Sequence, residues 1–363
     1  MVEVCARNGI TDSNAGATIA TPSDRPNFWT SMVSMPSRHG NRTILEWNVL
    51  DKRCSRNWRL RDNREEMSTA TGNGDRDGYE TESKKIAVGI RALVEAGRSS
   101  HEGRNLPDAA SIGMQHLGKQ TLFPQRPGQD RQEGLIDVCV GNASVSLFSG
   151  ESHLLAIADL LESETEPFVW TLPVVARAAL ESFAVVRHLM EDGVSFEARE
   201  GRAMNELVHS ARQMNKLSSE LGGSPVRLAH RLEQGDRMGL RRYTDRKGNA
   251  KEWFVETRPG STELVNALLK EGLGKAVYSK WSAVAHSLSW GVYQQVAARK
   301  IDSVTGQMFG MVTATTRNDA LLAQVVSHAH HECLMHFLQW HGWPIAKYNE
   351  VFFALMKAWK IPE

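Results

Sequence analysis

A run of polar and aromatic residues near position 280 has the types and spacing that could carry chemistry. Its members, which recur every three or four residues, are Tyr278, Trp281, Ser282, Ala285, His286 and Ser289. In a helix this spacing places them on one stripe. If the stripe is buried, its hydroxyl and imidazole groups need polar partners, because an unmade buried hydrogen bond costs about 1–3 kcal/mol. We therefore predict that His286 lies inside a helical bundle, hydrogen-bonded to the segment 173–192 or 196–221.

Charged residues on those two earlier segments are the candidate partners. Arg177 and Glu181 are an i,i+4 pair, and Arg202 and His209 lie two turns apart on one face of the next segment. Such a set fits a polar seam that fixes helix register. It also fits an anion-binding or RNA-cleaving pocket, in which arginine stabilises charge and histidine is the acid or base. The pocket would have Arg202, His209 and His286 as catalytic residues, and would bind substrate through Arg177, Glu181, Arg199, Tyr278 and Ser282.

The same residues carry a resemblance to a known family. The segments 177–181 and 278–287, with Arg199 and Arg202, are similar to uncharacterised actinobacterial helical proteins, which distantly resemble the HEPN superfamily of helical bundles. Many HEPN members are metal-independent ribonucleases of toxin–antitoxin and phage-defence systems, with an arginine and a histidine separated by four to six residues. Arg202 and His209 match this spacing, whereas Ala203 and Lys280 depart from the motif. The resemblance covers residues 154–298 and implies RNA as substrate and no cofactor.

A histidine-rich segment near the C-terminus suggests a metal site as an alternative. His328, Glu332 and His336 recur at i, i+4 and i+8, so they would line one face of a helix. Imidazole and carboxylate ligands at this spacing suit zinc, iron or nickel. The HExxH signature is absent, and a chance cluster on an amphipathic helix explains the pattern better. We therefore predict no metal cofactor.

The segment 227–251 is basic. Its eight lysine and arginine residues outnumber three acidic ones, an excess of five. The turn sequence Lys247-Gly248-Asn249 predicts a β-hairpin over residues 240–256. Nucleic acid could be held there by Arg241, Arg242, Arg246 and Lys247. The alternative is a solvated hairpin without a ligand.

The elements that must position these residues are mostly helices. Hydrophobic periodicity predicts a mostly α-helical bundle domain over residues 149–363, with one small β-hairpin. Helices are expected over 173–192, 196–221, 275–298 and 318–341. Turn and breaker residues dominate residues 1–148, which we interpret as a largely disordered or irregular extension with a helix over 82–96 and strand-like pieces within 136–148.

Composition narrows the function classes. With 43 basic and 42 acidic residues, the chain has no global attraction to nucleic acid or anionic membranes. No apolar run approaches the roughly 18 residues of a membrane span, and four scattered cysteines favour a reducing, cytoplasmic setting. Phosphate-loop, dinucleotide-binding and nucleophile-elbow motifs are absent.

Two functions stay open. One is a HEPN-like protein that binds or cleaves RNA, and the other is a non-catalytic helical scaffold or partner-binding protein. Whether the chain is an enzyme, forms a homodimer or has a cognate protein partner is not decided by these patterns.

Overall fold

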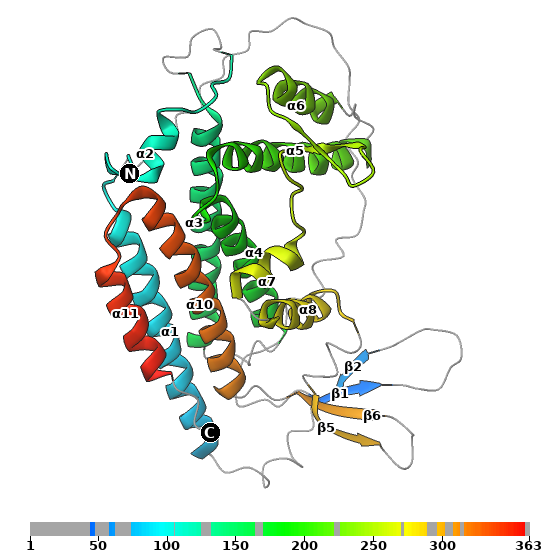
Figure 1. Cartoon of the computed structure of the whole chain (residues 1–363). Helices are drawn as coiled ribbons and strands as arrows, with labels where there is room; N and C mark the ends of the chain where they lie inside the picture. The colour runs from blue at the N-terminus through cyan, green and yellow to red at the C-terminus, as the bar shows by residue number, and fades with distance from the viewer. Residues whose placement is uncertain are drawn as a thin grey trace, which may run out of the picture. The chain divides into compact units, whose positions relative to one another are not determined.

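The computed structural model describes residues 44–47, 58–61, 74–104, 106–124, 132–163, 170–220, 226–269, 272–288, 296–301, 308–312 and 316–359. Within these ranges the chain is mainly helical (Figure 1), which confirms the predicted helical bundle with a small hairpin. None of the described helices is both long and apolar enough to cross a membrane.

The helix α3 (Leu135–Glu162) is the central element of the bundle. It contacts α1 (Gly74–His101), α4 (Thr171–Met190), α5 (Phe196–Glu220) and α10 (Thr316–His341). The strand-like pieces predicted within 136–148 are therefore wrong. A helix that is covered on several sides carries apolar residues around most of its circumference, so its helical period is weak in the sequence.

The helical bundle begins earlier than the predicted boundary at residue 149, which falls inside α3. Ile86, Ile90 and Leu93 of α1 are buried in the same core as α3. The helix predicted over 82–96 is thus confirmed, but α1 is longer and belongs to the bundle. Within the predicted extension, residues 1–43, 48–57, 62–73, 105 and 125–131 lie outside the described residues.

The helices α4, α5 and α10 follow the predicted ranges closely. Ser195 caps α5, since its side-chain oxygen accepts a hydrogen bond from the Ala198 N–H at 3.2 Å. The helix α4 contacts α7 and α8 as well as α3 and α10, so it links the parts of the bundle that carry the predicted site. The shorter helices are α2 (Ile112–Leu117), α6 (Val226–Arg237), α7 (Ser261–Leu269), α8 (Leu273–Ala285) and α11 (Ala346–Ala358).

The predicted hairpin is formed by the antiparallel strands β3 (Arg242–Thr244) and β4 (Ala250–Phe254). Its turn contains Gly248 at a φ of 81°, a left-handed conformation that favours glycine. Asn205 of α5 anchors β4: its amide oxygen accepts from the Phe254 N–H at 2.8 Å, and its amide nitrogen donates to the Phe254 carbonyl at 3.1 Å. The hairpin is therefore fastened to α5.

A four-stranded antiparallel sheet was not predicted. Its order is β2 (Trp58–Arg61), β1 (Ile44–Trp47), β6 (Met308–Val312) and β5 (Val296–Ile301). The strand β5 begins where the sequence predicts the end of a helix over 275–298. That helix instead ends at Ala285, because Ser287 adopts a left-handed φ of 52°. The N–H groups of Ser287 and Leu288 then donate to the carbonyls of Val284 and Ala283, a Schellman termination that usually requires glycine.

Candidate functional site

Two helices that are distant in sequence, α4 and α8, bring together Arg177, Glu181, Tyr278 and His286, which we call the Arg177 cluster. Arg177 donates from Nε to Glu181 Oε1 at 2.9 Å and from Nη2 to the Tyr278 hydroxyl at 3.2 Å. Its Nη1 lies 3.2 Å from His286 Nε2. The Tyr278 hydroxyl donates to Glu181 Oε1 at 2.6 Å. The guanidinium is thus held on two sides and meets an imidazole on the third.

The members of the Arg177 cluster differ in exposure and protonation. Tyr278 is buried, and burial together with the Glu181 hydrogen bond raises its pKa, so the phenol keeps its proton. Burial acts to lower the pKa of Arg177, but the hydrogen bond to Tyr278 and the charge of Glu181 outweigh it and raise that pKa. His286 is exposed. The imidazole is therefore the acid–base group of this cluster that solvent reaches most easily.

The structure confirms part of the prediction for His286. Its partner lies on α4, as expected, but the prediction that the side chain is buried is wrong. The reason is the early end of α8, which leaves His286 as the C-cap residue at the surface. Ser282 is half-buried on α8, and its hydroxyl makes no hydrogen bond to a described residue.

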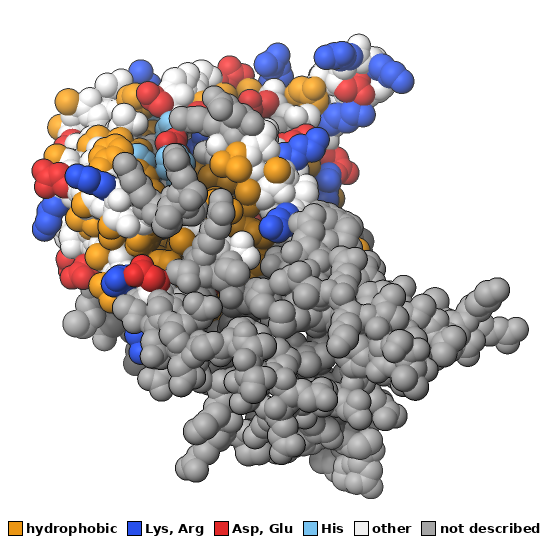
Figure 2. Space-filling view, turned by 90° about the horizontal axis from the view of Figure 1, so that it is seen from below, with side chains coloured by type: hydrophobic (Ala, Val, Ile, Leu, Met, Phe, Trp, Pro, Cys, Tyr) orange, Lys and Arg blue, Asp and Glu red, His pale blue; other side chains and the backbone are white. Residues whose placement is uncertain are grey.

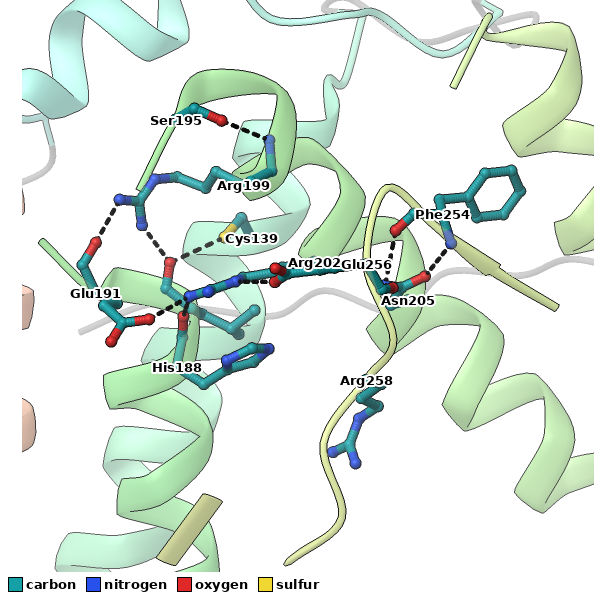
Figure 3. Close-up of polar contacts among 12 residues, drawn as sticks. Cys139, His188, Glu191, Ser195, Arg199, Arg202, Asn205, Phe254, Glu256 and Arg258 are labelled. Atoms are coloured by element: carbon teal, nitrogen blue, oxygen red, sulfur yellow. Dashed lines mark hydrogen bonds and ion pairs between the residues drawn. The ribbon is translucent and has the colours of Figure 1, made fainter. Parts of the chain in front are cut away.

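Arg199 and Arg202 belong to a different set of contacts, at the junction of α4 and α5 (Figure 3). Arg199 is 1% exposed and donates to the carbonyls of Leu189 and Glu191, the latter at 2.7 Å. Arg202 donates to the His188 carbonyl at 2.5 Å and to Glu191 Oε2 at 2.9 Å. The last carbonyls of a helix have no N–H partner within that helix. These two arginines donate hydrogen bonds to such carbonyls at the C-terminal end of α4. Their main role is to join α4 to α5.

The predicted pair of Arg202 and His209 is not formed. Two helical turns separate the residues by about 10 Å along α5, and no hydrogen bond or ion pair connects them among the described side chains. Arg202 Nε instead binds Glu256 Oε1 at 2.5 Å. His209 is half-buried, and burial followed by the charge of Arg258 lowers its pKa. The structure therefore separates two residues that the HEPN-type spacing had joined.

A cavity of about 390 Å³ lies between α4, α5, α7 and the segment that follows β4. Its polar lining includes Arg187, His188, Glu191, Arg202 and Glu256. His188 is buried, and burial followed by the charges of Arg202 and other arginines lowers its pKa to about 3, so the imidazole is neutral at pH 7. The sequence analysis did not include His188 among the candidates. His188 lies seven residues after Glu181, on the same face of the helix, and this spacing could have indicated it as a candidate.

No protein family model matches the chain, and no curated protein or solved structure matches it either. The resemblance to HEPN proteins therefore stays a prediction.

The basic hairpin contains both engaged and free side chains. Arg242 forms two bonds of 2.6 Å with Asp236, and its guanidinium lies 4.5 Å from the centroid of the Phe254 ring. It is thus part of the fold rather than a free phosphate ligand. Arg241, Arg246 and Lys247 are exposed and make no side-chain hydrogen bond to described residues. Over the surface seen from below, charges of both signs alternate, while basic side chains gather on one projection (Figure 2).

The histidine-rich segment of α10 does not assemble the predicted alternative metal site. His328 is exposed, while Glu332 and His336 are half-buried. In the part of the chain that the structure describes, no three His, Cys, Asp or Glu side chains are arranged to hold a metal ion. The nearby His331 ring stacks on Phe352 with 3.9 Å between centroids, so packing accounts for its position.

Proposed function

We propose that the Arg177 cluster is the active site of a HEPN-like, metal-independent ribonuclease. The observation that carries the proposal is the exposed His286 imidazole 3.2 Å from a guanidinium that Glu181 and Tyr278 hold in place. A fixed arginine beside an accessible histidine supplies a stabiliser of phosphate charge and a general base, which are the two functions needed to cleave RNA without a metal. Of the predicted catalytic residues, this proposal keeps His286, drops His209, and gives the role of Arg202 to Arg177.

The chemistry follows from the positions of the donors. A substrate phosphate would take the Arg177 Nη1 donor that now faces His286 Nε2, which frees the lone pair on that nitrogen. His286 then removes the proton from the ribose 2′-hydroxyl, whose oxygen attacks phosphorus as the bond to the 5′-oxygen breaks. The leaving oxygen takes a proton from water, and the product is a 2′,3′-cyclic phosphate. Arg177 stabilises the charge that builds up on the phosphate, and Tyr278 and Glu181 act as positioning residues.

Replacing His286 by alanine is expected to lower kcat/KM for RNA cleavage by about 10²–10⁴-fold, the usual contribution of a general base. Because His286 is exposed, the melting temperature should change little. His209→Ala is the matched control, since this second histidine lies outside the Arg177 cluster, and it should keep the activity. Cleavage should also persist in EDTA. Equal rates for the His286→Ala and wild-type proteins, or full loss in EDTA, would refute this mechanism.

The hairpin is proposed to hold the RNA backbone through its free cations. Changing Arg241, Arg246 and Lys247 together to alanine should weaken binding of single-stranded RNA by similar factors for all sequences. The slope of log K against log salt should fall by about 2, because each lost phosphate contact contributes about 0.7. Arg237→Ala, at an exposed arginine paired with Glu233, is the control and should leave the slope close to that of the wild type. An unchanged slope in the triple variant would show that the hairpin does not contact phosphates.

A second function, that of a non-catalytic scaffold or partner-binding protein, is favoured by the contacts of Arg199 and Arg202 with the carbonyls at the end of α4, which give both arginines a structural role. It requires that the wild-type protein cleave no RNA. A cytoplasmic setting is part of both proposals and is supported by Cys139 and Cys333, which are free, buried thiols. Homodimer formation and a cognate protein partner stay predictions.

A further inference from the structure

One face of α4 carries both the Arg177 cluster and part of the cavity lining. Arg177, Glu181, Ala184 and His188 recur at i, i+4, i+7 and i+11, a spacing that keeps them on one stripe. The last two line the cavity. The rise along the helix from Glu181 to His188 is about 10 Å. The cavity therefore lies on the same side of α4 as the Arg177 cluster, about two turns toward the C-terminus.

The charges around the cavity largely cancel one another. Glu191 accepts ion pairs from Arg187 at 3.1 Å and from Arg202 at 2.9 Å, and Arg202 also pairs with Glu256. A free phosphate or carboxylate would meet the carboxylates of Glu191, Glu256 and Glu263, whereas a simple cation would meet the two arginines. The lining thus selects against a strongly charged ligand of either sign.

Hydrogen-bonding capacity remains unused at the cavity. The His188 ring, which is neutral, makes no hydrogen bond to a described residue, and neither does Arg202 Nη2. A neutral imidazole offers one donor and one acceptor, and the guanidinium adds further donors. Since both residues line the cavity, a ligand with donors and acceptors on its edge would satisfy them.

The rest of the lining is apolar and the volume is small. Ala184, Pro259, Leu264 and Ala267 contribute carbon surface. About 390 Å³ falls within the range of small-molecule pockets. An uncharged ring with apolar faces and a polar edge combines these requirements, and a nucleobase is such a ring.

We propose that this cavity binds one unpaired nucleobase of the RNA substrate, with His188 and Arg202 hydrogen-bonded to its edge. The claim that the base belongs to RNA rests on the proposed function. The claim that the cavity binds a nucleobase does not depend on it. The rise along α4 from Arg177, beside the bond that is cut, to His188 is about 16 Å, which at about 3.4 Å for each stacked nucleotide corresponds to roughly five nucleotides. The cavity would therefore select a base at a fixed position relative to the bond that is cut.

The test is isothermal titration of the full-length protein with adenosine, guanosine, cytidine and uridine, which carry no phosphate. At least one nucleoside should bind, and free ribose should not. Ala267→Leu should weaken this binding by at least about 10-fold, because Ala267 is an exposed residue on the cavity rim and the larger side chain would fill the space without disturbing the core. The matched control is Ala276→Leu on α8, an exposed alanine that does not line the cavity and should leave binding unchanged.

His188→Leu provides the second variant, since it removes the ring nitrogens but keeps an apolar side chain of similar size. It should lower nucleoside affinity by about 10-fold or more, while His286→Ala keeps it. If no nucleoside binds to the wild-type protein, or if binding survives Ala267→Leu, the proposal is overturned. Nucleoside binding without RNA cleavage would support the cavity and reject the nuclease. RNA cleavage without nucleoside binding would support the nuclease and reject the cavity proposal.

Discussion

Replacing Glu151 by alanine is expected to lower the free energy of unfolding by about 1–3 kcal/mol, the cost of leaving a buried polar group without its hydrogen-bond partner. Glu151 of α3 is 2% exposed. Its Oε2 accepts a hydrogen bond from Arg98 Nε at 2.8 Å, and its Oε1 lies 3.4 Å from His330 Nε2. The variant would leave the fully buried His330 ring without this acceptor and would open a cavity in the core.

The size of this effect reflects how many helices meet at Glu151. His330 Nδ1 lies 3.0 Å from the hydroxyl of Tyr348, which is also fully buried. The chain of contacts from Arg98 through Glu151 and His330 to Tyr348 therefore connects α1, α3, α10 and α11. Burial acts to raise the pKa of Glu151, but the hydrogen bonds to His330 and Arg98 outweigh it and hold that pKa below its usual value. The carboxylate thus stabilises the fold above its unfolded pKa, and this contribution is lost as the pH falls through the folded pKa.

Urea unfolding at pH 7 measures the prediction. Glu162→Ala is the matched control, because Glu162 lies on the same helix and pairs with Arg91 at 2.8 Å, but its side chain is 36% exposed, whereas that of Glu151 is 3% exposed. Exposed pairs contribute about 1 kcal/mol or less. If Glu151→Ala costs no more than Glu162→Ala, the buried network does not carry the stability assigned to it.

Replacing His188 by glutamine is expected to remove a large part of the acid sensitivity of the fold. The His188 pKa is about 3 in the folded protein, against 6.5 as its ordinary value. As the pH falls below 6.5, the unfolded chain binds a proton that the folded chain does not bind, so stability decreases down to about pH 3. Between pH 7 and pH 4 the loss is on the order of 3 kcal/mol. Glutamine does not titrate, so this loss should be absent from the variant.

The measurement compares free energies of unfolding at pH 7 and pH 4 for both proteins. Other groups that titrate in this range, such as Glu151 and the buried His341, are common to both proteins, so their contributions cancel in the difference. His328→Gln, at an exposed histidine, should keep the pH dependence of the wild type. Equal losses in the wild-type and His188→Gln proteins would mean that His188 is protonated in the folded state well above pH 4.

The sequence by itself determined the elements whose signals are local. The apolar periodicity of α4, α5 and α10 and the turn at Gly248 predicted those elements to within a few residues. The contact between Arg177 on α4 and the polar stripe of α8 was also predictable, because a stripe that needs partners and a helix that offers them can be recognised from spacing alone. The helices and the turn depend on interactions within a few turns of the same segment, whereas the contact between α4 and α8 joins segments about 100 residues apart.

Only the tertiary structure decided which polar groups remain available. Arg202 and Arg242 have the same sequence signature as free cations, but one binds the end of α4 and the other binds Asp236, contacts that spacing cannot show. His286 became a surface residue because Ser287 adopts a left-handed conformation that serine rarely takes. The apolar residues of the central α3 show only a weak helical periodicity in the sequence, because other helices cover α3 on several sides. Burial and hydrogen-bond saturation depend on residues far away in the chain, so they emerge only when the helices pack together.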